Sequence, residues 1–233
     1  MTCNSIFITA TGTDVGKTYV SALLVKKMRE LGFDCGYYKP ALSGAVKTSD
    51  GNMLPGDCDF VLKTAGLDID PLNCVTYCFE EPVSPHLAAA RCGIEIDLNV
   101  IKADFERLSA NYDFMCVEGA GGITCPFNLS NKEILLPDVI KSLELGVVIV
   151  ADGGLGTINS VLLTVEYAKL YGIKILGIIL NNYDKMNFMH VDNKLQIETL
   201  TGVNIIATIP KMAEDIDISK NDLLDLFTVK VGL

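Results

Sequence analysis

The sequence is poor in the residues that build metal and disulfide sites. It has only two histidines, and none of its eight cysteines forms a Cys-x-x-Cys pair. Cys116 lies inside an apolar run, where cysteine acts as a small buried hydrophobe. These patterns argue against a disulfide framework and against structural zinc.

Basic residues and long apolar runs are also scarce. The 19 lysines and arginines are outnumbered by 29 aspartates and glutamates, the formal net charge is −10, and no basic cluster occurs. Nucleic acids bind to clustered lysines and arginines, so no nucleic-acid partner is expected. No run approaches the roughly 20 apolar residues that span a bilayer, and signal-peptide features are lacking. We therefore expect a cytoplasmic protein with a small-molecule partner and no membrane partner.

Linkers, internal repeats and low-complexity tracts are missing as well. The 233 residues are 49% hydrophobic, which is ample for one continuous core. The expected organisation is a single domain over residues 1–233.

What the sequence does contain is a phosphate-binding loop near its start. An apolar run at Ile6–Ile8 leads into Thr11-Gly12-Thr13-Asp14-Val15-Gly16-Lys17-Thr18, and an amphipathic segment follows. A strand that ends in a tight glycine turn and opens a helix leaves backbone N–H groups aimed at one point, which suits a triphosphate. The usual spacing puts the first glycine at Thr11, and this chain carries Gly12 instead. Lys17 is predicted to contact the β and γ oxygens, and the Thr18 hydroxyl to face Mg²⁺.

Short apolar runs alternate with helical patterns along the chain. Near-continuous apolar strands separated by helices indicate a parallel sheet that is covered on both faces. We therefore predict an α/β fold of the P-loop NTPase type, with a doubly wound, mostly parallel sheet flanked by helices. The predicted strands are Ser5–Ala10, Cys35–Lys39, Phe114–Val117, Val147–Ala151, Ile175–Leu180 and Asn204–Ile209. Loops with a short helix near Asp59–Ala65 are expected over Ala41–Pro85, and a packing helix around Leu223–Phe227.

Three polar positions follow the predicted strands. Glu118 ends one apolar run and precedes Gly119-Ala120-Gly121-Gly122, as expected of a magnesium-binding carboxylate beside a γ-phosphate. Lys39 enters a loop bounded by proline and glycine, where it is either a solvated charge or a group that stabilises phosphoryl transfer. Asp59 opens an apolar segment and is either a helix cap or a second magnesium ligand.

Taken together, the motifs resemble those of a known family. The set Gly12-x-Asp14-x-Gly16-Lys17-Thr18, Lys39-Pro40-x-x-Ser43-Gly44, Glu81-Pro82-Val83-Ser84-Pro85-His86, Glu118-Gly119-Ala120-Gly121-Gly122, Asn181-Asn182 and Ile209-Pro210-x-x-Ala213-Glu214 is similar to that of the dethiobiotin synthetases of the biotin pathway. Their order and spacing agree from the first predicted strand to about Asp215.

The resemblance implies an ATP- and Mg²⁺-dependent cyclo-ligase. Such an enzyme joins 7,8-diaminononanoate and CO2 into dethiobiotin, with ADP and phosphate as the other products. The reaction passes through a carbamate and a carbamic-phosphoric anhydride. The family also implies a homodimer.

The resemblance also implies roles for individual residues. Lys39 and Lys17 would be catalytic, and Thr18, Asp59 and Glu118 would hold the metal. Ser43, Gly122 and Asn159 would bind the substrate, Asn159 from a loop and helix start at Gly153–Ser160 near the dimer interface. The ATP-binding set would be Asp14, Val15, Gly16, Lys17, Thr18, Tyr19, Asp59, Glu118, Gly119, Ala120, Gly121, Asn181, Asn182, Ile209, Pro210, Lys211 and Glu214. Without the resemblance, Asn181-Asn182 is only a turn after a strand and Glu214 only a solvated acid.

Two other function classes share parts of this pattern. One is an amide synthetase of corrin synthesis, but those enzymes also carry an amidotransferase domain, which we do not expect within these 233 residues. The other is a partition or cell-division switch ATPase, which carries a signature lysine five residues before the loop lysine. That position is Gly12 here.

Overall fold

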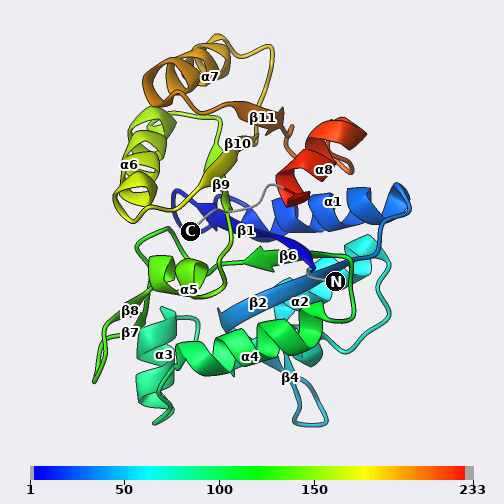
Figure 1. Ribbon diagram of the computed structural model, residues 1–233, viewed down its shortest axis with the longest axis vertical. Coiled ribbons are helices and arrows are strands. Elements are labelled where there is room, and N and C mark those ends of the chain that lie inside the picture. The colour runs from blue at the N-terminus through cyan, green and yellow to red at the C-terminus, as the bar shows by residue number, and fades with distance from the viewer. Residues whose placement is uncertain (1–2, 229–233) are drawn as a thin grey trace.

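A seven-stranded parallel sheet forms the centre of the molecule. The computed structural model describes residues 3–228 and is shown in Figure 1. The strands lie in the order β11-β10-β9-β1-β6-β2-β5, and every pairing between them is parallel. Their bounds are β1 Asn4–Ala10, β2 Cys35–Ser43, β5 Val75–Phe79, β6 Phe114–Glu118, β9 Val147–Asp152, β10 Ile175–Asn181 and β11 Ile205–Thr208. All six predicted strands are confirmed, and β5 is the strand of this sheet that the sequence analysis missed.

Helices cover both faces of this sheet (Figure 1). One face packs against α1 (Lys17–Glu30), α2 (Gly56–Ala65) and α8 (Lys220–Thr228), whose apolar side chains form one core cluster. The other face packs against α3 (Pro85–Arg91), α4 (Leu98–Ser109), α5 (Leu136–Ser142), α6 (Thr157–Leu170) and α7 (Phe188–Thr201). The predicted doubly wound α/β fold is therefore confirmed.

The region Ala41–Pro85 is more regular than predicted. Besides α2 it contains β5, the 3₁₀ helix η1 (Pro71–Cys74) and a small hairpin of β3 (Val46–Lys47) and β4 (Met53–Leu54). A second small hairpin joins β7 (Pro126–Asn128) to β8 (Ile134–Leu135).

Strand β2 extends four residues beyond the predicted end, so Lys39 lies within a strand and not in a loop. Residues Cys35–Tyr38 pair with β6, whereas from Lys39 to Ser43 the strand pairs with β5. Pro40 has no N–H to donate, and it is tolerated where β2 has lost its β6 neighbour. Lys39 therefore lies just past the paired part of β6, within reach of residues at the end of that strand.

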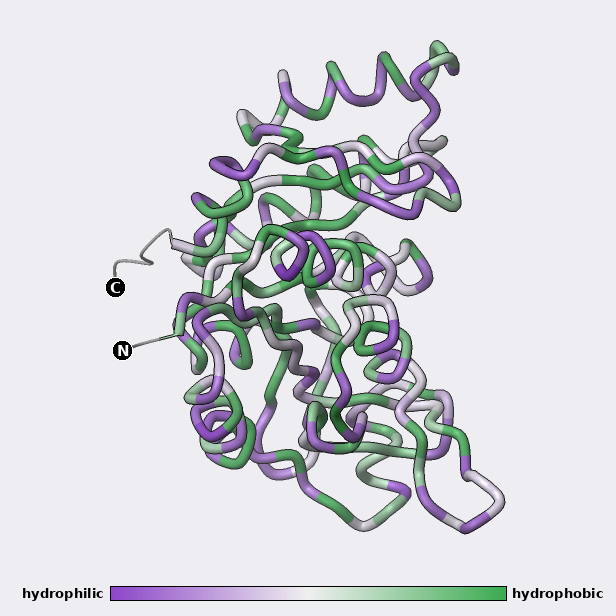
Figure 2. The backbone as a smooth tube through the Cα atoms, turned by 90° about the vertical axis from the view of Figure 1, so that its right-hand side faces the viewer, coloured by the Kyte–Doolittle hydropathy of each residue, from purple (hydrophilic) through white to green (hydrophobic). Residues whose placement is uncertain are grey.

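Hydropathy follows this architecture. In Figure 2 the strands through the middle of the molecule are largely hydrophobic, whereas α7 at the top alternates between hydrophobic and hydrophilic residues. This alternation is expected of a helix with one face on a core. Within residues 3–228, none of the helices has both the length and the apolar character needed to cross a bilayer.

Candidate functional site

The loop between β1 and α1 has the geometry of a phosphate cradle. Gly16 is the N-cap of α1 with φ of 96°, and Asp14 has φ of 60°, so both adopt left-handed backbone. Non-glycine residues rarely adopt such a conformation, and where they do it concentrates at functional sites. The first turn of α1 contains no acidic residue and no side-chain cap. Its N–H groups remain available to an anion.

Lys17 folds back over this loop. Its side chain is buried, and Nζ donates to the Gly12 carbonyl at 3.1 Å. Burial lowers the pKa of Lys17 below its ordinary value, with Glu118 acting in the opposite direction. An anion bound in the loop would therefore find a partly desolvated lysine at its side.

Glu118, at the end of β6, is the centre of a buried charge cluster. It is fully buried, and its Oε1 accepts hydrogen bonds from Thr18 Oγ1 at 2.8 Å and Lys39 Nζ at 2.5 Å. Its Oε2 accepts from the Tyr37 hydroxyl at 2.8 Å. Lys39 Nζ also donates to Asp57 Oδ2 at 2.7 Å. The lysine therefore bridges two carboxylates beside the phosphate loop.

The bridge keeps Lys39 charged. Burial alone would lower the pKa of Lys39, but Glu118 and Asp57 together raise it above its ordinary value. A lysine in this state is a fixed positive charge and a hydrogen-bond donor, and it cannot serve as a base near neutral pH.

These groups line a pocket of about 870 Å³. The loop Pro82–Pro85, from the Glu-Pro-Val-Ser-Pro-His motif, closes another side of it, and Cys125 also lines it. The predicted site residues that the pocket brings together are Asp14, Gly16, Lys17, Thr18, Tyr19, Lys39, Ser43, Glu118, Ala120 and Gly121.

The second carboxylate in the pocket is Asp57 and not the predicted Asp59. Asp57 lines the pocket, whereas Asp59 does not line it and its Oδ2 accepts from Lys63 Nζ at 2.7 Å. Residues two positions apart on an α-helix point about 200° apart around its axis, so Asp57 and Asp59 cannot face the same way. The structure therefore does not bring Asp59 to Glu118.

Asn181 lies beside the phosphate loop. Its Nδ2 donates to the Val15 carbonyl at 3.0 Å, while its buried Oδ1 has no hydrogen-bond partner among residues 3–228. A free buried acceptor fits a ligand that carries an amino group, as adenine does. The Asn182 side chain does not bond to the phosphate loop, and its Nδ2 donates to Asp152 Oδ2 at 2.8 Å.

The segment after β11 is held against α1. The Tyr19 hydroxyl donates to the Ala213 carbonyl, and Lys26 Nζ donates to the Glu214 carbonyl at 2.8 Å. The predicted base-contacting residues Pro210, Lys211 and Glu214 are exposed on this segment, and Ile209 is buried at its start. They lie outside the lining of the main pocket, but Tyr19, which lines it, bonds to Ala213 of the same segment.

Three more predicted site residues, Gly119, Gly122 and Asn159, lie outside the lining of the pocket. A Cβ on Gly122 would come within 3.5 Å of Gly12 backbone, and a Cβ on Gly119 within 2.9 Å of Phe7, so both strand-end glycines permit close packing. Asn159 is exposed on α6 and does not line the pocket.

Oxygen donors suited to Mg²⁺ converge here. The Thr18 hydroxyl and the Glu118 and Asp57 carboxylates are hard ligands of the type that Mg²⁺ takes when it also binds nucleotide phosphates. Two carboxylates and a hydroxyl leave further coordination positions for phosphate oxygens and water, so these residues fit the ion.

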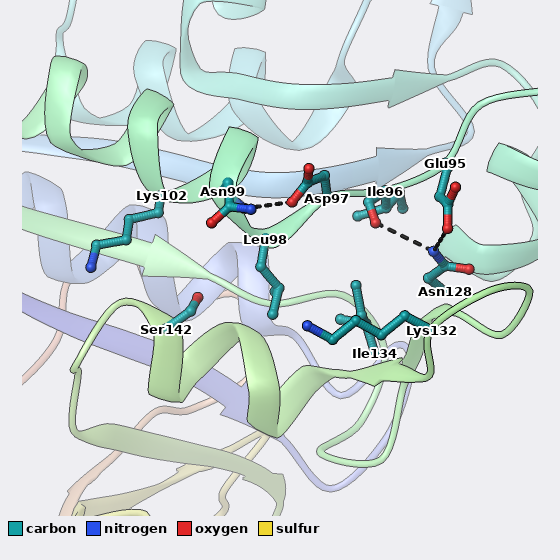
Figure 3. A pocket seen from close by; sticks show the side chains of 10 residues that line it. All are labelled: Glu95, Ile96, Asp97, Leu98, Asn99, Lys102, Asn128, Lys132, Ile134 and Ser142. Atoms are coloured by element: carbon teal, nitrogen blue, oxygen red, sulfur yellow. Dashed lines mark hydrogen bonds between the residues drawn. The ribbon is translucent and has the colours of Figure 1, made fainter.

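A second cavity, of about 650 Å³, lies between the start of α4, the β7–β8 hairpin and α5 (Figure 3). In its wall the Asn128 side chain already donates to Glu95, and Asp97 accepts from the Asn99 backbone N–H. In Figure 3 the polar side chains of this cavity do not converge on one point. The pocket beside the phosphate loop is therefore the better candidate site.

Comparison with known proteins agrees with this geometry. Residues 4–217 match the family model described as an AAA domain. The chain is 45% identical over 228 residues to the ATP-dependent dethiobiotin synthetase BioD of Clostridium perfringens, covering 98% of each chain. It is 43% identical over 222 residues to the protein of that name from Clostridium botulinum strain Alaska E43, covering 95% and 97%. The chain belongs to the dethiobiotin synthetase family. The expected resemblance is thereby confirmed.

Solved structures show how widely the fold of this family member is shared. The MinC:MinD cell division complex of Aquifex aeolicus superposes with a TM-score of 0.56 at 16% identity, covering 91% of this chain and 83% of that one. A ParA family ATPase of Chlorobium tepidum gives 0.53 at 14% identity, covering 98% and 91%. At such identities the likeness is one of fold alone.

Proposed function

We propose that this chain catalyses the ATP-dependent closure of 7,8-diaminononanoate and CO2 into dethiobiotin, ADP and phosphate. The observation that carries the proposal is the 45% identity, over 98% of both chains, to an ATP-dependent dethiobiotin synthetase. The phosphate loop and the cluster around Glu118 contain the groups that such a reaction needs.

The proposed reaction has two displacement steps. One amine of the substrate takes up CO2 as a carbamate, and a carbamate oxygen attacks the γ-phosphorus while ADP leaves. The second amine then attacks the carbonyl carbon, phosphate leaves, and the ureido ring closes. Both reactants of the first displacement are anions, so their approach requires fixed positive charge.

Lys17 and Lys39 supply that charge in this proposal. Lys17 bonds to the phosphate loop itself, and Lys39 and Ser43 of β2 both line the pocket. Because Lys39 stays protonated, its role is to orient the carbamate and offset charge on the transferring phosphoryl group. Ser43 and the backbone at Gly121–Gly122 complete the substrate side, and Asn181 Oδ1 accepts from the adenine amino group.

We assign the metal to Thr18, Glu118 and Asp57, with Asp57 in place of the expected Asp59. When bound, Mg²⁺ neutralises charge on the β and γ oxygens. Asp57 is preferred because it and Glu118 share Lys39 as a hydrogen-bond partner, and because it lines the pocket.

The proposal includes a homodimer. Large apolar side chains are exposed on α6, α7 and the loop before α6, among them Leu155 at 91%, Leu163 at 64% and Phe188 at 87%. Phe188, Val191 and Leu195 recur at helical spacing on α7, and a contiguous apolar face of this kind is typical of an interface. Sedimentation equilibrium tests the state directly, and a cytoplasmic location stays a prediction.

The decisive experiment measures phosphate release from ATP, Mg²⁺ and bicarbonate, with and without 7,8-diaminononanoate, while dethiobiotin is followed by mass. Phosphate release that requires the diamine and matches the product one for one supports the proposal. Hydrolysis without the diamine and without a ring product contradicts it, and would turn attention to a switch ATPase or an amide synthetase.

A further inference from the structure

Glu118 is held by more than the groups assigned to the reaction. Thr18 and Lys39 both donate to its Oε1, the oxygen on the pocket side of the cluster. Its other oxygen, Oε2, accepts from the Tyr37 hydroxyl at 2.8 Å. Tyr37 has no part in the roles set out above.

Tyr37 is well placed to hold one oxygen of the carboxylate. It is 1% exposed, and it lies two residues before Lys39 on β2, so both side chains point to the same face of the sheet. Tyr37 pairs with Cys116 across the sheet, which places Glu118 two residues further along β6 on the same face. The Tyr37 hydroxyl donates to Glu118 Oε2, and Glu118 Oε1 stays directed at Thr18 and Lys39.

A carboxylate needs such a partner to keep its orientation. The terminal torsion of glutamate is broad, so an unheld carboxylate rotates easily. A hydrogen bond to Oε2 from a side chain locked in the core fixes the plane of the group and leaves Oε1 directed at Thr18 and the phosphate loop. Partners of this kind commonly set both the orientation and the affinity of a metal ligand.

We propose that Tyr37 is a positioning residue that orients Glu118 for the metal–nucleotide complex. The inference rests on the role proposed above for Glu118. Tyr37 touches neither substrate nor metal and acts only through the carboxylate.

The chain contains a matched control in the next residue. Tyr38 is also 1% exposed and lies on the same strand, but it belongs to the core cluster on the opposite face of the sheet. Its hydroxyl pairs with Thr76 Oγ1 at 2.6 Å and donates to the Ile101 carbonyl at 3.1 Å. Tyr38→Phe therefore removes the hydrogen-bonded hydroxyl of an equally buried tyrosine, and neither of its two partners is Glu118.

The test measures Mn²⁺ binding in the presence of ADP by electron paramagnetic resonance, which needs no turnover. Tyr37→Phe is expected to weaken Mn²⁺ binding about 10- to 100-fold, the range seen when partners of metal ligands are removed. Tyr38→Phe is expected to change it less than about threefold. In steady-state assays, Tyr37→Phe should raise the Mg²⁺ concentration for half-maximal rate, and excess Mg²⁺ should restore most of kcat.

Variants of Glu118 and Tyr37 together distinguish failure of the role proposed for Glu118 from failure of the role proposed for Tyr37. If Glu118→Gln leaves Mn²⁺ binding unchanged, the role of Glu118 fails and the inference fails with it. If Glu118→Gln weakens binding and Tyr37→Phe does not, only the inference is overturned. Equal weakening by Tyr37→Phe and Tyr38→Phe also overturns it, because the effect is then a general loss of packing. If Tyr37→Phe does not fold because the buried carboxylate loses a donor, the double variant Tyr37→Phe/Glu118→Gln is compared with Glu118→Gln: equal Mn²⁺ binding supports action through Glu118, and further weakening overturns the inference.

Discussion

Exchanging each of the two acids at the start of α2 for its amide should have very different effects. Asp57 and Asp59 are two residues apart and each accepts a hydrogen bond of 2.7 Å from a lysine. Asp57 bonds Lys39 within the pocket, whereas Asp59 does not line the pocket and bonds Lys63, an exposed lysine. We expect Asp57→Asn to impair turnover and Asp59→Asn to leave it nearly unchanged.

The magnitudes follow from burial. Asp59 is 22% exposed but its partner Lys63 is 75% exposed, and pairs four residues apart on a helix surface contribute only about 0.3–0.5 kcal/mol. Lys39 is 5% exposed, and a hydrogen bond to a charged group is worth about 1.5–3 kcal/mol. Because Asp57 itself is 42% exposed, the lower end of that range applies, and about 1.4 kcal/mol corresponds to a tenfold change. Loss of a metal ligand would act in the same direction.

The assay follows dethiobiotin formation at varied Mg²⁺ and records the thermal unfolding of each variant. Asp57→Asn should lower kcat/KM by about tenfold or more and raise the Mg²⁺ requirement. Asp59→Asn should stay within about twofold of the parent, as expected from loss of an exposed pair. If Asp59→Asn proves the more damaging change, the assignment of the pocket carboxylate to Asp57 is refuted.

Three further substitutions probe the site. Lys39→Ala should reduce kcat by about 10²–10³-fold, as loss of a transition-state donor does, while the nucleotide Kd from calorimetry changes little; unchanged turnover would remove Lys39 from the mechanism. Gly16→Ala should abolish nucleotide binding without unfolding the protein, because φ is 96° and a Cβ would lie 2.2 Å from Asn181 Nδ2; normal binding would contradict this. Burial lowers the pKa of Lys17 in the free protein, and a bound phosphate would raise it. At a pH between the pKa of the free protein and that of the complex, ADP binding therefore takes up a proton, and the Kd for ADP rises with pH. Lys17→Arg, which stays charged, should show no such proton uptake in buffers of different ionisation enthalpy, and uptake equal to that of the parent would exclude Lys17 as its source.

The sequence predicted the sheet well because its central strands are nearly continuous apolar runs. Strand β5 was not predicted because it lies at the edge of the sheet. Its residues Val75–Cys78 are only half-buried there, so the strand is not a continuous apolar run. Strand β2 was predicted to end at Lys39 because Pro40 is normally a strand breaker. Its pairing with β5 alone, which makes a proline acceptable there, depends on the missed strand.

The identity of the second pocket carboxylate depended on helical phase. The short helix was expected to begin near Asp59, but α2 begins at Gly56. Because α2 begins three residues earlier, Asp57 also falls inside the helix, and the angle of about 200° between residues two positions apart lets only one of the two acids face the pocket. Sequence patterns locate helix ends only to within a few residues, so this choice required the structure.

Tyr37 was read only as part of an apolar strand. Its role depends on the register between β2 and β6, a contact between residues 81 positions apart. The motifs identified Lys39 and Glu118 separately, and their family resemblance brought them into one site. Nothing in the local sequence distinguishes Tyr37 from Tyr38, although the alternation of side chains places them on opposite faces.

The Glu118 cluster links stability to function. A fully buried carboxylate would cost several kcal/mol if it were unpaired, and here Thr18, Tyr37 and Lys39 all donate to it. These donors come from α1 and β2, and Asp57 adds α2 through Lys39, so one buried charge joins these elements to β6. The contacts that make the charge tolerable are therefore those that preorganise the site. Substitutions inside the cluster should lower the unfolding temperature together with turnover, whereas substitutions in the phosphate loop should reduce nucleotide binding at nearly constant stability.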